Sequence, residues 1–307
     1  MGDRLCLLTV HAHPDDESSK GAGTVARYHA EGVHTVLVCC TGGEEGDVLN
    51  PAMDRPEVRD RLPEIRMEEL ARATELIGYD EVVLLGYRDS GMPDTPANDD
   101  PRSFARAPLE EAVGRLVAQI RRARPQVIVT YGDERGYRHP DHLRVHEASL
   151  AAFDRAGDPN AFPEAGDPWQ PQKLYYTVWS RARMWAVHRK FLELGMESPF
   201  DPERLGPPEG DGEVTTRIDI SGQADVAREA LLAHATQVDP TWRGWFGLPP
   251  EVARTVHPFD EYTLAKVAGE AMSERGEQAP GAPGHDGPFE DDLFAGIRTP
   301  VGSRPIR

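Results

Sequence analysis

The feature that most constrains the fold is a regular alternation of short apolar strands and amphipathic helices over about the first 155 residues. The sequence predicts strands at residues 5–10, 34–40, 81–85 and 126–131, and helices at 21–31, 62–77, 109–124 and 142–153. This alternation is typical of βαβ units, whose right-handed crossovers build a parallel sheet covered by helices. We therefore expect an α/β fold with a Rossmann-like, mostly parallel sheet and helices on both faces.

The later part of the chain has a less regular pattern. We expect a Rossmann-like core at residues 1–160, a portion at 161–270 that packs on the core and forms the substrate pocket, and a partly disordered linker and tail at 271–307. The later portion is predicted to contain strands at 173–179 and 213–220, helices at 181–194 and 222–236 with Ser221 as N-cap, and a loop at 199–212. Residues 274–287 have few apolar side chains and read as a disordered linker. Beyond them, Leu293 and Phe294 form a short apolar patch that could dock on the body of the protein.

Composition limits the classes of partner. No apolar run approaches the length that spans a membrane, and the N-terminus has no secretory signal pattern. Cys6, Cys39 and Cys40 all fall in predicted core strands, as expected for buried thiols in a reducing cytosol. We therefore expect a soluble, cytoplasmic protein. The net charge of −18 argues against nucleic acid and against anionic membranes as partners. Homo-oligomerisation stays open.

The triplet His-Pro-Asp occurs twice, each time just after a predicted strand. His13-Pro14-Asp15 follows the strand at 5–10 and continues with two more acids, whereas His139-Pro140-Asp141 follows the strand at 126–131 after a short loop. In the common doubly wound strand order 3-2-1-4-5, the first and fourth strands are neighbours, and ligands bind at the switch point between their C-terminal ends. Topology is therefore expected to bring both triplets to one site.

The residue types of this site favour a divalent metal ion. His13, Asp16 and His142 are the expected ligands, and three protein ligands leave a position open for water, as in catalytic sites. His11 and His146 could in principle also bind the metal, because each shares a strand or helix face with an expected ligand. The more ordinary interpretation of these two histidines is a core or supporting role. Zn²⁺ suits hydrolytic chemistry, and Fe²⁺ is the alternative for two histidines and one carboxylate.

The other polar groups complete a set for metal-assisted amide hydrolysis. Asp15 is next to the ligand Asp16 and is the expected general base for water. His139 is expected to protonate the leaving amine or to stabilise the tetrahedral oxyanion, and Asp141 to fix the tautomer of His139. Tyr137 is expected to donate to the same oxyanion.

The loop Gly42-Gly43-Glu44-Glu45-Gly46 resembles a phosphate cradle only superficially. It lacks GxGxxG spacing and a Walker lysine, and its two acids would repel phosphate. A polar loop beside a neutral polyhydroxy substrate fits better. For Arg66 and Asp89, a surface ion pair and a sugar-contacting role are equally compatible with the sequence.

The motifs His13-Pro14-Asp15-Asp16-Glu17 and His139-Pro140-Asp141-His142 resemble those of the LmbE-like zinc N-deacetylases, the family of the N-acetylglucosaminyl-phosphatidylinositol deacetylases. Three other segments support the resemblance: Thr41–Gly46, Arg88–Met92 and Gly136–His142. The likeness is strong over residues 4–150 and looser beyond, and within the family the chain looks most like its actinobacterial mycothiol branch.

The resemblance implies zinc on His13, Asp16 and His142, with Asp15 as base, His139 as acid or electrostatic stabiliser, Asp141 as its partner and Tyr137 near the oxyanion. It implies further that Arg66 and Asp89 hold glucosamine hydroxyls, that Lys20 lies near a large acyl group, and that Asp47 lines the site. Arg138 departs from the small residue of the deacetylases and receives no role.

The expected function is hydrolysis of the amide in mycothiol S-conjugates, a small-molecule thiol–sugar substrate, during detoxification. Ser18–Gly21 and Glu290–Gly296 favour this activity within the branch. The first alternative is deacetylation of N-acetylglucosaminyl-inositol in mycothiol biosynthesis, which uses the same catalytic residues. The second is a non-catalytic protein that binds a metal or a sugar.

Overall fold

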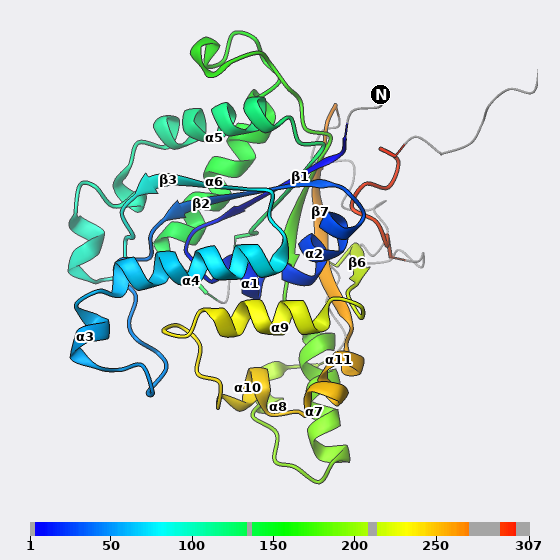
Figure 1. Cartoon of the computed structure of the whole chain (residues 1–307). Coiled ribbons are helices and arrows are strands. Elements are labelled where there is room, and N and C mark those ends of the chain that lie inside the picture. Colours follow the sequence, from blue (N-terminus) through cyan, green and yellow to red (C-terminus); the bar gives the residue numbers. More distant parts are fainter. Residues whose placement is uncertain (1–3, 134–136, 208–213, 270–288, 299–307) are drawn as a thin grey trace, which may run out of the picture.

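The computed structural model describes residues 4–133, 137–207, 214–269 and 289–298. Its centre is a seven-stranded sheet in the order β3-β2-β1-β4-β5-β7-β6 (Figure 1). The five strands of the predicted order pair in parallel. They are β1 (Cys6–His11), β2 (His34–Thr41), β3 (Glu81–Tyr87), β4 (Val127–Thr130) and β5 (Lys173–Val178). The predicted fold class and the neighbouring positions of β1 and β4 are confirmed.

Two antiparallel strands extend this sheet beyond β5. β7 (Phe259–Val267) pairs with β5, and β6 (Thr216–Asp219) pairs with the outer edge of β7. The sequence prediction missed β7, and within the described residues it made β6 too long. The boundary drawn at residue 160 thus lies between strands of one continuous sheet.

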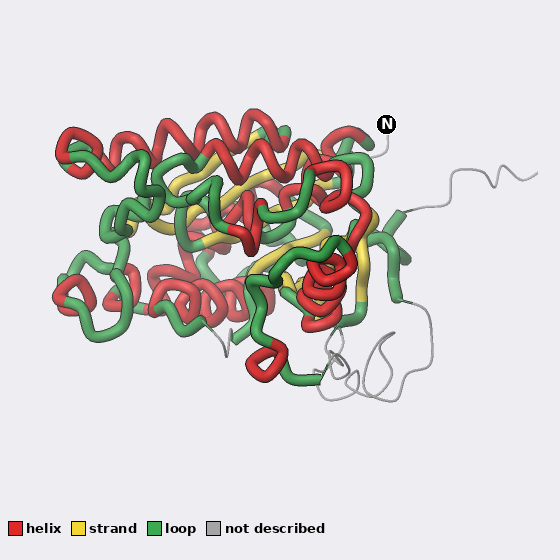
Figure 2. The backbone as a smooth tube through the Cα atoms, turned by 90° about the horizontal axis from the view of Figure 1, so that it is seen from below, coloured by secondary structure: helices red, strands yellow, loops and turns green. Residues whose placement is uncertain are grey.

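Helices cover both faces of the sheet, as Figures 1 and 2 show. One face carries α2 (Ala22–Ala30), α4 (Leu62–Ile77) and α9 (Ala224–Ala233), and the other carries α5 (Leu109–Ala123) and α6 (Pro140–Arg155). The strands are apolar throughout because both of their faces are buried. In β1, for example, Leu8 and Leu7 are both fully buried, in separate core clusters.

The remaining helices are short or lie outside the two layers. They are α1 (Asp16–Ser19), α3 (Pro56–Arg59), α7 (Arg181–Glu193), α8 (Pro202–Leu205), α10 (Arg243–Phe246) and α11 (Pro250–Val256). Of these only α7 was predicted, and α8 falls where a loop was expected. The prediction of Ser221 as an N-cap was wrong, because α9 begins three residues later, with Gln223 at the N-cap.

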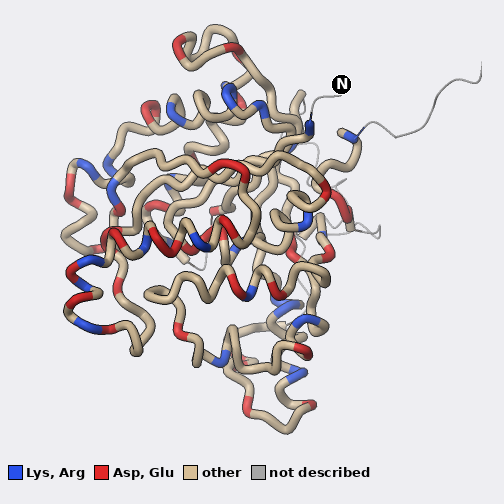
Figure 3. The backbone as a smooth tube through the Cα atoms, in the orientation of Figure 1, with Lys and Arg blue, Asp and Glu red and all other residues tan. Residues whose placement is uncertain are grey.

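The surface charge is mixed. Figure 3 shows acidic and basic residues interspersed on outer helices such as α3 and α4. Among the described residues, no helix is long and apolar enough to cross a membrane.

The segment 289–298 docks on the body, as predicted for its apolar patch. Leu293 and Phe294 are fully buried, and the ring of Phe294 packs edge-on against Tyr28 with 5.2 Å between ring centroids. The Tyr28 hydroxyl accepts the Leu293 N–H at 2.7 Å, and Glu290 pairs with Lys173 at 3.1 Å. Residues 274–287, predicted to be a disordered linker, lie outside the described residues, as do residues 299–307.

Replacing Phe294 with alanine is expected to lower the free energy of unfolding by about 3–5 kcal/mol, because it leaves a cavity against Tyr28. Phe289→Ala is the matched control in the same segment: its ring is 38% exposed, so the expected loss is below about 1 kcal/mol. Urea unfolding followed by circular dichroism measures both. Equal losses in the two variants would show that the segment is not anchored by its apolar patch.

Candidate metal centre

The two His-Pro-Asp motifs meet where β1 and β4 end. β1 pairs with β4 from Leu7 opposite Val127 to Thr9 opposite Val129, so the chain leaves both strands at the same edge of the sheet. After β1 it turns through Pro14 into α1, and after β4 it enters α6 at Pro140. Proline at the first helical position, with His139 as N-cap, suits the start of α6. Strand pairing therefore brings together residues about 125 positions apart.

The three expected metal ligands converge. The Asp16 carboxylate oxygen Oδ2 lies 3.6 Å from His13 Nδ1 and 3.3 Å from His142 Nε2. All three side chains are buried, and their ligand atoms lie within 4.8 Å of one another. Two atoms that bind one Zn²⁺ at about 2.1 Å in tetrahedral geometry lie roughly 3.4 Å apart. The residues present therefore fit a single divalent ion.

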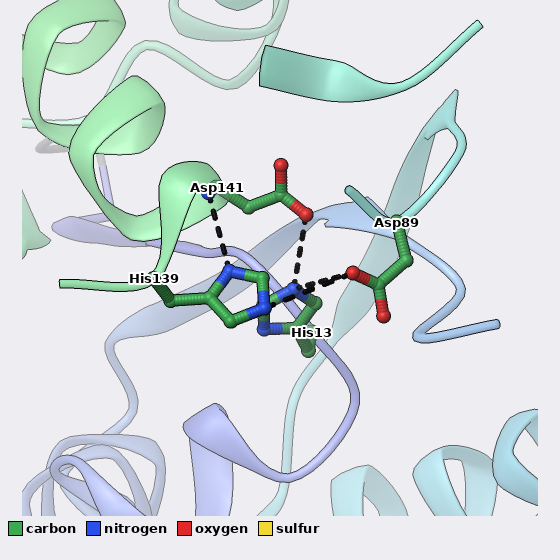
Figure 4. A group of neighbouring side chains, drawn as sticks. All are labelled: His13, Asp89, His139 and Asp141. Carbon is green, nitrogen blue, oxygen red and sulfur yellow. Dashed lines mark hydrogen bonds and ion pairs between the residues drawn. The ribbon is translucent and has the colours of Figure 1, made fainter. Parts of the chain in front are cut away.

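The ring of His13 is held from its other side by carboxylates. Its Nε2 lies 3.1 Å from Asp141 Oδ2 and 3.5 Å from Asp89 Oδ1 (Figure 4). A proton on Nε2 satisfies these acceptors and leaves the lone pair of Nδ1 directed at Asp16. A carboxylate behind a histidine is the usual device that orients a metal ligand.

The electrostatics of the cluster also favour a cation. Burial lowers the pKa of His13, but its contacts with Asp141, Asp16 and Asp89 outweigh burial and raise this pKa well above the usual value. Burial acts to raise the pKa of Asp16, and the neighbouring His142 and His13 hold it well below its usual range instead. Three buried carboxylates around one histidine are an excess of negative charge, which a divalent ion would offset.

Asp141 orients His139 differently from the prediction. Its carboxylate hydrogen-bonds to His13 and accepts the Ser90 N–H at 2.9 Å and the Ser90 hydroxyl. The backbone N–H of Asp141 donates to His139 Nδ1 at 3.2 Å. The backbone N–H of Asp141, and not its carboxylate as expected, therefore sets the tautomer of His139. The carboxylate contacts His13 instead.

His139 presents its other nitrogen to the centre of the site. Because Nδ1 accepts a hydrogen bond, the proton of the neutral ring resides on Nε2, which lies 3.9 Å from Asp89 Oδ1. Burial lowers the pKa of His139 to about 4, and the nearby His13 adds to the effect. Its ring meets that of His13 edge-on, with centroids 4.5 Å apart.

Asp15 lies beside the ligand triad with a strained backbone. Its φ of 117° is in the left-handed region, which residues other than glycine rarely adopt. Its carboxylate contacts the Arg66 guanidinium at 3.1 Å and is partly exposed. Burial raises the pKa of Asp15 above its usual value and Asp16 adds to this rise, whereas Arg66 opposes it.

Arg66 and Asp89 are both buried, which excludes the first of the two interpretations, a surface ion pair. The Arg66 guanidinium donates to the carbonyls of Gly43 and Pro14, each at 2.6 Å, as well as to Asp15. A Cβ on Gly43 would lie 2.3 Å from that guanidinium, which explains glycine in this loop. Asp89 Oδ1 accepts the Gly91 N–H at 2.8 Å while facing His13.

Lys20, Tyr137 and Asp47 are the three remaining predicted residues, and they differ in their distance from the expected ligands and in their exposure. Lys20 reaches to within 3.9 Å of Asp16 Oδ1 and lies over the ring of Tyr131. Tyr137 is half exposed, and its ring stacks loosely on His139. Asp47 is exposed, and its carbonyl accepts a hydrogen bond from Gln237 at 3.1 Å.

The two competing histidines lie outside the ligand triad. His11 is buried with its Nδ1 3.1 Å from the Tyr131 hydroxyl, and His146 Nδ1 lies 3.0 Å from the Tyr131 carbonyl. Both support Tyr131, whose ring stacks on His142 with 4.5 Å between centroids.

An apolar cavity of about 400 Å³ opens beside Asp15. Its wall comes from α1, from the loop after β2, and from α9, α10 and the segment between them. The lining residues are Asp15, Ser19, Leu49, Leu231, Gln237, Val238, Asp239, Trp242 and Trp245. The segment 241–246 thus supplies two tryptophans, Trp242 and Trp245, to this cavity.

The sequence did not predict the buried residues that hydrogen-bond to the predicted site residues and hold them in place. Ser90 holds Asp141, and Glu17 accepts the Asp15 N–H at 2.9 Å while pairing with His234 at 2.6 Å. Glu17 is within the first motif, so its position was a signal. His234 had no such signal because it lies 217 positions away.

Comparison with known proteins agrees with this geometry. The family model described as GlcNAc-PI de-N-acetylase (PIG-L) matches residues 8–153. The chain is 41% identical to mycothiol S-conjugate amidase of Streptomyces coelicolor, over 97% of this chain and 99% of that protein. It is 40% identical to 1D-myo-inositol 2-acetamido-2-deoxy-alpha-D-glucopyranoside deacetylase 1 of Catenulispora acidiphila, over 95% and 89% respectively.

Solved structures share the fold. The N,N'-diacetylchitobiose deacetylase from Pyrococcus horikoshii aligns with a TM-score of 0.59 at 18% identity, over 85% of this chain and 84% of that one. The conserved protein TT1542 from Thermus thermophilus aligns with a TM-score of 0.54 at 25% identity, over 88% and 99%. A hydratase from a Pseudomonas species has the same fold, with a TM-score of 0.55 at 19% identity over 87% and 99%, so the fold by itself does not fix the reaction.

Replacing His142 with alanine is expected to weaken zinc binding by more than about 100-fold, because it removes one of three ligands. His146→Ala is the matched control, one helical turn further along α6, and it is expected to bind zinc as the wild type does. Competition with a chromophoric chelator measures both affinities. An unchanged affinity in His142→Ala would contradict the ligand assignment.

Proposed function

This chain belongs to the PIG-L family of de-N-acetylases, and from that premise we propose that it is a zinc-dependent amidase acting on mycothiol S-conjugates. The products would be glucosaminyl-inositol and an N-acetylcysteine S-conjugate, as suits a detoxification enzyme of the cytoplasm. The relative from Streptomyces coelicolor bears the name of this activity, and it aligns over nearly the whole of both chains.

The chemistry needs a cation, a base and a group that stabilises the oxyanion. Zn²⁺ bound by His13, Asp16 and His142 would polarise the amide carbonyl and lower the pKa of a water molecule. Asp15 would take the proton from that water, because its carboxylate is next to the ligand Asp16 and borders the cavity. Arg66 keeps the Asp15 carboxylate in place through their contact at 3.1 Å.

His139 would act from the opposite side. Its Nε2–H can donate to the oxyanion of the tetrahedral intermediate or to the nitrogen of the leaving amine. The hydrogen bond from the Asp141 N–H to Nδ1 supports this assignment, because it leaves the proton on Nε2. Tyr137, stacked on His139 at the rim, would add a second donor once substrate is bound.

The polar part of the substrate would lie towards the buried side of the site. We propose that Asp89 and Arg66 contact glucosamine hydroxyls, that Asp47 lines the rim, and that Lys20 lies near the acyl group. The direct contacts of Arg66 with Asp15, and of Asp89 with His13, would then link sugar binding to the catalytic groups.

The observation that carries the choice of substrate is the apolar cavity beside Asp15. An acetyl group has one methyl to bury, whereas the acyl part of an S-conjugate is an N-acetylcysteine with an additional group on sulfur. A cavity of about 400 Å³ walled by Trp242, Trp245 and Leu231 is matched to the larger acyl part.

The alternative function is that of the inositol deacetylase, which is favoured by relatives of that name at almost the same identity. A non-catalytic binding protein would not need Asp15 and His139 in these positions.

Hydrolysis of two substrates by the zinc-loaded protein tests the proposal. We expect kcat/KM for a mycothiol S-conjugate to exceed that for N-acetylglucosaminyl-inositol by at least about tenfold, and Asp15→Asn to lose most activity on both, by about 100-fold or more. A preference for the acetylated sugar would identify the protein as the deacetylase instead. Absence of hydrolysis on both substrates would leave only the binding alternative.

Replacing Trp242 with alanine is expected to lower kcat/KM for a conjugate with a bulky apolar S-substituent by about tenfold, because part of the cavity wall is lost. The same change is expected to alter hydrolysis of the acetylated sugar by less than about twofold. Trp242→Phe is the control that keeps an aromatic wall over Gly244. Equal losses on both substrates would mean that Trp242 does not select the acyl group.

A further inference from the structure

Glu17 is a buried acid with no part in the proposed chemistry. Its side chain is fully buried, and one oxygen, Oε2, accepts the backbone N–H of Asp15 at 2.9 Å. Its other oxygen accepts the Ser18 hydroxyl and lies against His234 Nε2, each at 2.6 Å. Both carboxylate oxygens are therefore occupied by partners inside the protein.

The residue that Glu17 anchors is strained. Asp15 has φ of 117° and ψ of −26°, a conformation that persists only when neighbouring groups impose it. The Asp15 carbonyl starts α1 by accepting the N–H groups of Ser18 and Ser19 at 3.1 and 3.0 Å. The contact from Glu17 back to the Asp15 N–H completes an arrangement like a capping box. Together these bonds fix where the Asp15 carboxylate points.

His234 holds Glu17 from the other side. It is fully buried and follows the last residue of α9, where the carbonyl end of the helix favours a positive charge. The chain that continues from it forms the cavity wall at Gln237, Val238 and Trp242. The pair Glu17–His234 therefore joins the turn that carries Asp15 to the segment that lines the cavity.

We propose that Glu17 and His234 are positioning residues, which hold Asp15 in its strained conformation and tie it to the wall of the acyl cavity. This inference rests on the proposed role of Asp15 as general base. Loss of the anchor would let the Asp15 backbone relax and move its carboxylate away from the reacting water, while the metal ligands and the substrate pocket stay in place.

The test compares Glu17→Ala with Glu17→Gln in the zinc-loaded full chain. Glu17→Ala is expected to lower kcat by about ten- to 100-fold, as small displacements of catalytic groups do, with KM changed by less than about threefold. Glu17→Gln is expected to recover most of kcat, because its amide oxygen can still accept the Asp15 N–H. His234→Ala is expected to fall between the two. Zinc affinity is expected to stay within about threefold of wild type in all variants.

Glu69→Ala is the matched control. Glu69 is equally buried and holds the same segment through Thr236 at 2.7 and 2.8 Å, but its bonds go to Thr236 rather than to Asp15. If Glu69→Ala lowers kcat as much as Glu17→Ala, or if Glu17→Gln fails to recover activity, the effect is general packing and the proposal is overturned. A change in KM or zinc affinity without a change in kcat would overturn it as well.

A second measurement separates this inference from the proposed function. The exchange rate of the Asp15 amide proton, followed by NMR, reports the anchor without any substrate. Faster exchange of the Asp15 amide proton in Glu17→Ala, with an unchanged rate in Glu69→Ala, supports the anchor. An unchanged rate in Glu17→Ala overturns it. If Asp15→Asn hydrolyses substrate at the wild-type rate, the base role of the proposed function fails, whatever the exchange rate shows.

Discussion

The parallel pairing of β1 with β4 is the constraint on which the site depends. The first histidine motif follows β1 directly, whereas His139 of the second comes nine positions after Thr130, the last residue of β4, and the expected ligands are divided between the two motifs. The pairing of Leu7 with Val127 directs both strands to one edge of the sheet, where Asp16 and His142 lie 3.3 Å apart. Burial of both faces of these strands specifies their register, and a shift in register would separate the expected ligands.

His13 contacts an expected metal ligand on one side of its ring and supporting carboxylates on the other. Its two ring nitrogens face opposite groups, with Nδ1 towards Asp16 and Nε2 towards Asp141 and Asp89. The backbone N–H of Asp141 donates to His139, so one residue orients both the expected metal ligand His13 and the proposed oxyanion donor His139. The second histidine motif thus does more than supply His142, because its aspartate fixes two imidazole rings in different directions.

The parts of this structure that were predictable are those with a local signal. Apolar runs gave five strands, and strand order brought the motifs together, so His13, Asp16 and His142 could be placed near one another from the sequence. The strand β7 was missed because it follows an irregular stretch and most of its side chains are only half-buried, which weakens the alternation of apolar residues. The partner of Asp141 could not be predicted, because choosing between His13 and His139 depends on side-chain directions after the turn. The contact of His234 with Glu17 could not be predicted either, since no spacing rule connects residues 217 positions apart.

The proposed function divides the site into a catalytic part and a part that would bind the acyl group. The expected metal ligands and Asp15 come from the turn after β1, from the start of α1 and from the first turn of α6, which all lie at one edge of the sheet. The cavity wall comes from α1, from Leu49 in the loop after β2, and from α9, α10 and the segment between them, which lies outside the sheet and includes Val238 and Trp242. The Glu17–His234 contact at 2.6 Å joins the segment after α9 to the turn that carries Asp15, and both side chains are fully buried. Substitutions at wall positions such as Trp242 would therefore reshape the proposed acyl cavity while this buried contact keeps the wall joined to the proposed base.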